Sequence, residues 1–439
     1  MFYLNKQQEL TTELLSKMIN RFRLNVEPKL RKYKNYYDGV HAILNKSYVD
    51  ANKPCNKTVI NYCKNIVDSY CGYIATPEHI SYRSEQDIEE IMHILRYNDY
   101  QSEDSDFLLN ALIYGVAHEL MYMDYEGKVR FRIINPTQSF GVFDDSLTGD
   151  LMYFVRIYKI NDWDESDLYN VDVYGDYSVK HYTMNGMNGY VTYKDEEQHY
   201  FGQCPANIFY LPDEKSVFDC IMSLQDASNE ILSSEIDDYS AFCDAYLTLT
   251  GVDLEAEDVA SMKENRVLLL PEGATAAWLT KSANDVQVEN ILKRIHDSIY
   301  RISSCVDFSN DSLMSGVASG ISIQYKMCGQ ENRAAKIESE MKKALQRRVE
   351  IICGIASLKI GEEVFRDIQI DFKRNIPEDI STAIQIVNSL QGIVSNETLI
   401  SQLSFVSDVS AEIEAVKKQK EENMSLYSFG TVYNDDAEE

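Results

Sequence analysis

His118 and Glu119 match the first half of the H-E-x-x-H motif, in which two histidines one helical turn apart hold a zinc ion. Tyr122 stands where the second histidine should be, so the motif lacks one of its metal ligands. The chain has 7 histidines, and the others are scattered along it. A lone histidine is more often a packed side chain than a ligand, and we expect His118 to pack in a helix.

Other signatures of catalysis are also missing. The chain has neither the P-loop pattern G-x-x-x-x-G-K-[ST] nor the G-x-S-x-G turn of serine hydrolases. Acidic pairs such as Glu89-Glu90 and Asp237-Asp238 are frequent, but adjacent residues on a helix do not face each other. A two-metal nuclease needs carboxylates that converge from separate elements, which a sequence cannot show. We expect no catalytic residue, no metal and no cofactor, with a metal-dependent DNA-processing enzyme as an alternative.

Cysteines and apolar runs indicate the compartment. The 9 cysteines show no C-x-x-C spacing and are odd in number, which is typical of reduced, buried thiols in a cytosolic setting. The first residues, MFYLNKQQELTTELL, lack a basic start followed by an apolar run, so we expect no signal peptide. No stretch approaches the roughly 18 apolar residues that span a bilayer, and we expect no membrane partner.

Length and charge narrow the class of protein. A chain of 439 residues is too long for one compact core, and we expect roughly two to four domains or an elongated subunit. The net charge of −28 argues against a protein that grips DNA by its phosphates, because such proteins carry basic patches. It is compatible with a protein that lets DNA slide past, and equally with a simple gain in solubility. The 30 tyrosines suit subunit interfaces as well as ordinary β-sheet packing.

The first half of the chain reads as helices followed by strands. Apolar spacing predicts helices from about residue 8 to residue 125, with clear faces at 60–73 and 106–122. From Gly127 the pattern changes to short alternating runs separated by turn residues. These runs predict antiparallel strands at 129–133, 152–160, 169–174, 177–184 and 189–193.

The second half is mostly helical. Helical spacing covers 217–242, 288–302, 334–352 and 380–390, with a further helix at about 409–422. A small mixed insert with a strand at 266–270 separates the first two helices, and a Ser/Asn/Gly-rich break at 307–320 precedes the third. A strand is expected at 367–372. The sequence therefore predicts an α+β fold.

Several segments, in order along the chain, resemble the portal proteins of tailed bacteriophages, typified by the phage SPP1 portal. The early segments are YKNYYDG at 33–39, NKTVINYCKNIVD at 56–68, GY at 72–73, GVAHELMY at 115–122, NP at 135–136, FDD at 143–145 and RIY at 156–158. In place of the family's G-K/N-P-I, the chain has ATPEHI at 75–80. The later segments are SLQD at 223–226 continuing to YL at 246–247, SGVASGISIQYKM at 315–327, FKRNIPED at 372–379, LQG at 390–392 and SNETL at 395–399.

The resemblance implies a portal-type subunit with an α/β wing, a two-helix stem, a small mixed clip insert and a helical crown. The implied parts are the N-terminal part of the wing at 1–215, a stem helix at 216–245, the clip at 246–285, a second stem helix at 286–306, a tunnel loop at 307–320, a wing helix and strand at 321–376, the crown at 377–425 and a flexible acidic tail at 426–439. The loop residues expected to meet DNA are Ser309, Asn310, Asp311, Ser312, Met314 and Ser315.

The function that the resemblance implies is a ring at the capsid vertex of the virion, through which double-stranded DNA is packaged and ejected. The expected partners are further copies in a homo-oligomeric ring (a dodecamer), the terminase large subunit, a head–tail adaptor, and the major capsid and scaffolding proteins, with assembly in the host cytoplasm. The alternatives are a head–tail adaptor ring, which is usually shorter, the DNA-processing enzyme named above, and an acidic scaffolding protein, which would lack the tyrosine-rich strands.

Overall fold

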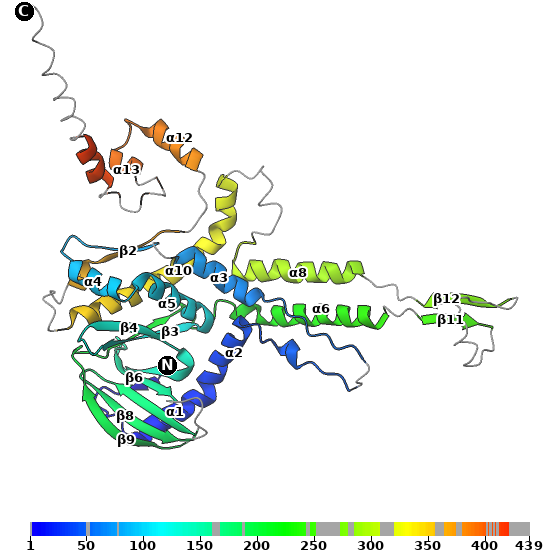
Figure 1. Ribbon diagram of the computed structural model, residues 1–439, viewed down its shortest axis with the longest axis horizontal. Coiled ribbons are helices and arrows are strands. Elements are labelled where there is room, and N and C mark those ends of the chain that lie inside the picture. The colour runs from blue at the N-terminus through cyan, green and yellow to red at the C-terminus, as the bar shows by residue number, and fades with distance from the viewer. Residues whose placement is uncertain are drawn as a thin grey trace, which may run out of the picture. The chain divides into compact units, whose positions relative to one another are not determined.

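The protein is described by a computed structural model (Figure 1). The described residues are 2–49, 53–76, 79–159, 167–186, 189–242, 246–251, 273–279, 285–307, 320–355, 364–374, 380–400, 403, 406, 409 and 412–420. The chain divides into two compact units, one of Met1–Ala318 with Ile323–Asn375 and the other of Ser319–Ser322 with Ile376–Glu439. Helices and sheets are both present, which confirms the predicted α+β class.

The first unit begins with a short strand and a run of helices. Their bounds are β1 Phe2–Leu4, α1 Thr12–Arg21, the π-helix η1 Phe22–Val26, α2 Glu27–Tyr37, the 3-10 helix η2 Ala42–Asn45, α3 Tyr62–Ile74, β2 Ile80–Arg83, α4 Glu89–Tyr97 and α5 Tyr100–Tyr114. Asn61 caps α3, because its side-chain oxygen accepts a hydrogen bond from Lys64 N at 2.9 Å. α5 ends where Gly115 adopts a left-handed backbone with a φ of 81°.

Strands dominate the next hundred residues. Their bounds are β3 Val116–Met123, β4 Val129–Ile134, β5 Ser139–Asp144 after the 3-10 helix η3 Pro136–Gln138, β6 Leu151–Tyr158, β7 Leu168–Tyr174, β8 Ser178–Asn185, β9 Val191–Gln198 and β10 Ala206–Tyr210. One sheet has the order β1-β5-β6-β7-β8-β9 and a second has the order β10-β3-β4. Within these two described sheets, every neighbouring pair is antiparallel except β1 with β5. Side chains join the two sheets, since Phe154 on β6 meets His118 on β3 edge-on with ring centres 5.4 Å apart.

Two paired helices and a small strand pair follow. The bounds are the 3-10 helix η4 Asp219–Ile221, α6 Met222–Phe242, β11 Tyr246–Thr250, β12 Thr275–Leu279 and α8 Asp285–Ser303. α6 and α8 lie side by side (Figure 1), and β11 and β12, which come between them in the sequence, form an antiparallel pair. The rest of the chain contains α10 Gly320–Cys353, α11 Val364–Asp367, β13 Gln369–Phe372, which pairs with β2, and, in the second unit, α12 Ile380–Leu390, α13 Asn396–Ile400 and helical residues 412–420.

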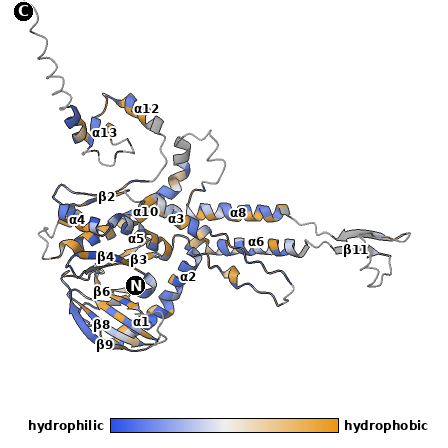
Figure 2. Cartoon of the chain, viewed as in Figure 1, coloured by the Kyte–Doolittle hydropathy of each residue, from blue (hydrophilic) through white to orange (hydrophobic). Residues whose placement is uncertain are grey.

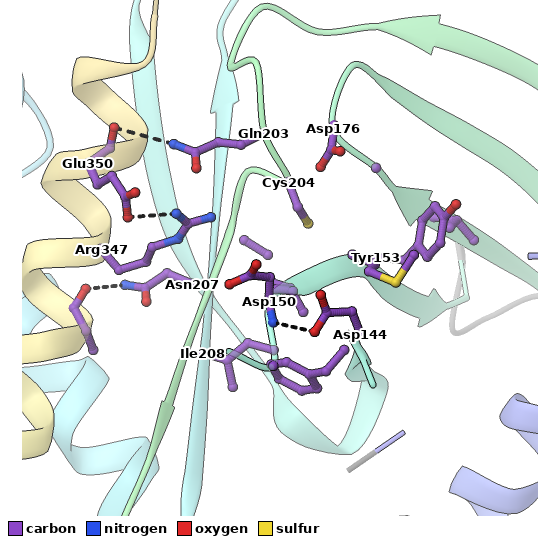
Figure 3. A pocket seen from close by; sticks show the side chains of 18 of the residues that line it. Asp144, Asp150, Tyr153, Asp176, Gln203, Cys204, Asn207, Ile208, Arg347 and Glu350 are labelled. Atoms are coloured by element: carbon purple, nitrogen blue, oxygen red, sulfur yellow. Dashed lines mark hydrogen bonds and ion pairs between the residues drawn. The ribbon is translucent and has the colours of Figure 1, made fainter. Parts of the chain in front are cut away.

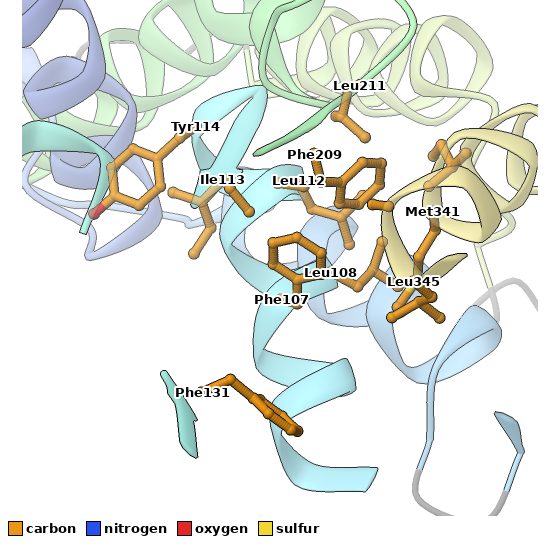
Figure 4. Packing of buried hydrophobic residues seen from close by; sticks show 14 of the residues in the cluster. Phe107, Leu108, Leu112, Ile113, Tyr114, Phe131, Phe209, Leu211, Met341 and Leu345 are labelled. Atoms are coloured by element: carbon orange, nitrogen blue, oxygen red, sulfur yellow. The ribbon is translucent and has the colours of Figure 1, made fainter. Parts of the chain in front are cut away.

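The core of the first unit lies where α5 meets α10 and the three-stranded sheet (Figure 4). Phe107 and Leu112 of α5 are fully buried, as are Met341 and Leu345 of α10. Phe209 of β10 packs with its ring centre 5.5 Å from that of Phe107. Burying each of these side chains contributes roughly 1.5–3 kcal/mol. α10 is therefore held firmly against the sheet-bearing body of the unit.

A buried ionic cluster adds to this contact. Arg348 of α10 is wholly inaccessible to solvent, and its guanidinium pairs with Glu119 of β3 and Asp104 of α5. Tyr82 donates to Asp104 at 3.0 Å, and Asn207 donates to Glu119 at 3.0 Å. Burial would lower the pKa of the guanidinium, but the two carboxylates raise it, so Arg348 stays charged. The cluster links α5, β3, β10 and α10 through one charged group.

The structure corrects two boundaries of the predicted helices. The helix expected at 106–122 ends at Tyr114, and Val116–Met123 is a strand, so His118 lies in a sheet and not in a helix. β3 is buried on both faces and therefore shows no polar–apolar alternation, which is why its sequence resembles that of a buried helix. The helix expected from 216 begins at Met222, after a 3-10 turn.

The predicted strands from 129 to 193 are confirmed as antiparallel, although β9 extends to Gln198. β2, β5 and β10 were not anticipated. β2 lies within the stretch 8–125, which was expected to be helical, so the prediction was wrong there. The strand expected at 266–270 lies outside the described residues.

Candidate functional site

The six residues expected to contact DNA, Ser309, Asn310, Asp311, Ser312, Met314 and Ser315, lie outside the described residues, which end at Asp307 and resume at Gly320. Their positions therefore stay a prediction. The structure does describe both edges of this segment: the end of α8 and the beginning of α10.

The last turn of α8 is fastened to the body of the first unit by hydrogen bonds to its free carbonyls. Tyr70 of α3 donates to the carbonyl oxygens of Ser303 and Ser304 at 3.0 and 3.1 Å. Arg333 of α10 donates to Ser303 O at 2.7 Å and to Val217 O, just before α6, at 2.8 Å. These contacts satisfy carbonyl groups that a helix end leaves unpaired. The near ends of α6 and α8 are thus fixed to α3 and α10.

An aromatic cluster lies between α3 and α8, close to where the expected tunnel loop begins. The ring of His296 on α8 lies 5.7 Å from that of Tyr62 and 4.9 Å from that of Tyr300. One ring nitrogen of His296, Nε2, lies 3.6 Å from the carboxylate of Asp307. Burial, with the charge of Asp307, raises the pKa of Tyr300 to about 12. Asp307 is therefore held near α8 at the start of the segment.

α6 is acidic along its whole length. It has no lysine or arginine, and its carboxylates are Asp226, Glu230, Glu235, Asp237 and Asp238. Hydrophilic and hydrophobic residues alternate along both α6 and α8 (Figure 2). A helix of this charge repels phosphate groups and offers them no cation to bind.

Residues 40–49 and 53–61, between α2 and α3, run along α6, and we call them the arm. Backbone N–H groups at every second residue of the arm donate to side chains at every fourth residue of the helix. The four bonds run from Asn56 to Asp237 at 2.5 Å, from Thr58 to Ser233 at 3.0 Å, from Ile60 to Asn229 at 3.0 Å and from Tyr62, the first residue of α3, to Gln225 at 2.9 Å. We call this set the polar ladder.

The polar ladder is possible because two residues of the extended arm span nearly the same length as four residues of α6. Two residues of an extended chain span about 6.6 Å, and four residues of an α-helix rise about 6.0 Å. Gln225 and Ser233 also donate to the carbonyl oxygens of Ile60 and Thr58, at 2.5 and 3.5 Å. The side chains of α6 thus bind the arm as a neighbouring strand would, through donors and acceptors together.

The rest of the arm is also tied to α6 by polar contacts. His41 is buried; its Nε2 donates to Tyr36 O at 2.9 Å, so its Nδ1 is the acceptor for Asn229 at 2.8 Å. Lys46 lies 3.4 Å from the carboxylate of Asp237. Burial would raise the pKa of Asp237, but hydrogen bonds from Asn56 and the charge of Lys46 lower it. Asp237 therefore stays ionised.

A cavity of about 1110 Å³ lies between the six-stranded sheet, β10 and α10 (Figure 3). On the helix side, Arg347 pairs with Glu350 at 2.7 Å, and Gln203 donates to the Glu350 carbonyl at 3.4 Å. On the sheet side, one carboxylate oxygen of Asp144 accepts from Ser146 Oγ at 2.7 Å and from Asp150 N at 2.9 Å, which closes the β5–β6 hairpin. Arg347 and Glu350 thus neutralise each other, and Asp144 serves the hairpin turn through one of its two carboxylate oxygens.

Two side chains of reactive types near this cavity, Cys204 and His118, are held in their uncharged forms. Burial raises the pKa of Cys204 to about 12, so its thiol stays protonated. Burial lowers the pKa of His118 to about 3, and its ring bonds to Ser139 Oγ at 2.8 Å. In the described part of the chain, no three His, Cys, Asp or Glu side chains form a metal-binding group. None of its helices is long and apolar enough to cross a membrane.

Sequence reasoning missed the polar ladder. Its signal was present as Gln225, Asn229, Ser233 and Asp237, a polar row at four-residue spacing on an otherwise amphipathic helix. Such a row normally indicates a solvent-facing side, yet these residues are buried. Their partner is an extended chain without periodicity of its own, which pattern reading does not detect.

Comparison with known proteins identifies the family. No curated protein matches the chain. The family of phage portal proteins described as SPP1 Gp6-like matches residues 23–426, nearly the whole chain. The family forms the ring of the capsid through which DNA is packaged. The chain therefore belongs to the SPP1 Gp6-like phage portal proteins and functions as a phage portal protein.

Proposed function

We propose that α6 and α8 are the stem of the portal subunit and that residues 246–285 between them are the clip. On this assignment the wing comprises residues 1–215 and 321–376, the tunnel loop 307–320 and the crown 377–425, while the expected acidic tail at 426–439 lies outside the described residues. The ring is a dodecamer that closes head-to-tail by rotation about one axis.

The observation that carries the proposal is the hairpin of α6 and α8. α6 leaves the body next to α3 and α10, and α8 returns to the same place, where Arg333 bonds to both chain segments. The described ends of the insert, β11 and β12, pair with each other. An insert closed at its base by paired strands can present a compact surface at the end of a two-helix stem.

The tunnel loop would touch DNA without holding it. Ser309, Asn310, Ser312 and Ser315 offer hydrogen bonds without fixed positive charge, and Met314 offers a flexible apolar contact. Asp311 would repel phosphate. The acidic α6 supports the same idea of a channel that guides DNA without gripping it. A separate ATPase, the terminase large subunit, would supply the work of packaging.

The remaining partners follow from these assignments. The clip would bind the terminase during packaging and the head–tail adaptor afterwards, and the wing would contact the major capsid and scaffolding proteins. The ring would assemble in the host cytoplasm and remain at the portal vertex of the virion. None of these roles requires catalysis by the subunit itself.

The loop assignment is tested by replacing residues 307–320 with a short rigid linker. The variant should still form rings, because the described ends of α8 and α10 are anchored by Tyr70 and Arg333. It should fail to package DNA in a packaging assay with the purified motor. A Gly/Ser linker of the original length is the control and should retain part of the activity. Unimpaired packaging by the rigid variant would contradict the assignment.

A further inference from the structure

A groove of about 510 Å³ runs between α6 and α8 on the side of Tyr62, and we call it the stem groove. Its lining residues are Tyr62, Glu235, Glu289, Leu292, Lys293 and His296. Within the described residues, neither Glu235 nor Glu289 forms an ion pair. The lining has one lysine, Lys293, against the two carboxylates. The neighbouring α6 has no lysine, arginine or histidine. The stem groove therefore offers an acidic site beside the apolar side chains of Tyr62 and Leu292.

The outer flank of α8 has the opposite character. Ile291 and Ile302 are 47% and 48% exposed, and they are 11 residues apart, about three full turns, so they share one side of the helix. Arg294 and Arg301 are exposed on the same side, and in the described part of the chain neither has a carboxylate partner. We call these four residues the α8 flank. Uncovered apolar side chains grouped with unpaired cations indicate a contact with another molecule.

The stem groove and the α8 flank face in different directions. Each residue of an α-helix turns by about 100°, so Glu289 points about 160° away from Ile291 and about 140° away from Arg294. The groove side of the hairpin therefore carries two carboxylates and one lysine, a net negative charge, and the flank side carries two arginines and the exposed Asp297, a net positive charge. A closed head-to-tail ring requires two different, complementary sides on every subunit, and the hairpin supplies such a pair.

We infer that the α8 flank of one subunit packs into the stem groove of the next copy of the chain. Ile291 lies against the apolar part of the groove, and Arg294 pairs with Glu235. The inference rests on the proposed assignment of α6 and α8 to the stem, and it names the surfaces by which neighbouring stems join. The partner is a second copy because the family assembles as a ring and the two surfaces complement each other in charge.

Arg294 and Glu235 are expected to meet because their side chains lean toward the same height along the ring axis. If the stem runs along the ring axis, rotation from one subunit to the next does not change the height of a residue along that axis. Glu235 and Glu289 line the same groove, so they are at similar heights, and Arg294 starts about 7.5 Å nearer the body than Glu289. Helical side chains lean toward the N-terminus of their helix. Since the two helices are antiparallel, Arg294 leans away from the body and Glu235 toward it, which brings their charged groups level.

The contact is tested first by cysteine cross-linking. Glu235→Cys and Ile291→Cys are combined in a chain whose Cys243 and exposed Cys220 and Cys328 are replaced by serine. Rings are isolated by size, treated with a short bismaleimide and run on a denaturing gel. We expect a ladder of covalent multimers up to the full ring.

The matched control for cross-linking pairs Ile291→Cys with Leu24→Cys in the same background. Leu24 is 71% exposed on η1, so a cysteine there is accessible to the reagent, and it does not line the stem groove. The control should give no ladder. Rings that yield only monomers from the first pair, or equal ladders from both variants, overturn the inference.

Charge reversal provides the second test. Arg294→Glu should raise the protein concentration needed for half-maximal ring assembly by about tenfold at low salt, because it would face Glu235 of the next copy. Adding Glu235→Arg should restore assembly, since the charges are then exchanged between the two sides. Lys194→Glu, on the exposed β9, changes the net charge equally and should leave assembly unchanged.

The outcomes distinguish this contact from a role of Arg294 in the DNA channel and from an error in the stem assignment. Normal assembly of Arg294→Glu, or no rescue by the exchange, overturns the inference. Normal rings of Arg294→Glu that fail to package DNA would assign the arginine to the DNA channel and overturn it as well. Rings of the unmodified chain that protect neither α6 nor α8 from hydrogen exchange would instead contradict the stem assignment.

Discussion

Arg348 of α10 donates from its Nε to both carboxylate oxygens of Glu119 on β3, at 2.9 and 3.0 Å, in a site that water does not reach. The two residues are 229 positions apart in the sequence. Their pairing joins α10, the long helix that follows the proposed tunnel loop, to the three-stranded sheet that contains β3. Removing either partner would leave a buried charge without its counterion.

Replacing Arg348 by methionine should lower the free energy of unfolding by about 3–5 kcal/mol, because Glu119 and Asp104 would remain buried without a cation. Denaturation in urea at fixed protein concentration measures the change. Arg96→Met is the control, since Arg96 pairs with Glu89 on the surface, and it should cost less than about 0.5 kcal/mol. Similar costs for the two variants would show that the buried cluster does not stabilise the fold.

Asn229→Ala should destabilise the arm. Asn229 is fully buried; its side-chain oxygen accepts from Ile60 N and Gln225 Nε2, and its amide nitrogen bonds to His41, so its loss removes a partner from three groups at a cost of about 1–3 kcal/mol. Hydrogen exchange at the amide of Ile60 should speed up, while amides in α5 keep their protection. Ser223→Ala, on the exposed side of α6, is the control. Unchanged exchange at Ile60 would show that the polar ladder does not hold the arm.

The attachment of the arm should weaken in acid through Asp237. Its pKa is lowered in the folded protein, so its contribution is complete above the ordinary carboxyl pKa of about 4 and is lost as the pH falls through the lowered value. Exchange at the Asn56 amide should therefore accelerate as the pH falls below about 4, beyond its intrinsic pH dependence. In Asp237→Asn the side chain does not titrate, and this extra acceleration should disappear. Its persistence would assign the effect to another group.

Gly115→Ala should be strongly destabilising. Gly115 has a φ of 81°, and a Cβ there would lie 2.6 Å from the backbone carbon of Lys215. Strain and overpacking together should cost about 2–5 kcal/mol, measured by thermal or urea unfolding. Gly72→Ala is the matched contrast, because it lies inside α3 with no atom within 4 Å of the added Cβ. It should stabilise the protein by about 0.5–1 kcal/mol.

Much of the fold follows from local periodicity. β4 and β8 were predicted because apolar and polar residues alternate along each and the apolar ones are buried or partly buried; β7 alternates in sequence too, although its polar Asp172 is buried with Val171 and Val173. α8 and α12 were predicted from apolar faces with a period near 3.6. β3 could not be recognised, because a strand buried on both faces has no alternation to read. The turn at Gly115 also depends on the approach of Lys215, a contact between residues a hundred positions apart.

The candidate site was predictable only in part. A break after Asp307 is predicted from the Ser, Asn and Gly content of the segment, and both the break and its six selected residues stay a prediction, because residues 308–319 lie outside the described residues. The role of Gln225, Asn229, Ser233 and Asp237 was not predictable, because their partners are backbone groups, which every sequence contains. The buried position of Arg348 likewise depends on two carboxylates from distant elements.

The attachment points of the polar ladder follow a helical path around α6. Four residues advance a helix by about 40° beyond a full turn, so three steps from Gln225 to Asp237 carry the line of attachment about 120° around α6. The arm therefore crosses the helix obliquely. Twisting α6 about its own axis would draw the arm lengthwise, and pulling on the arm would apply torque to the helix.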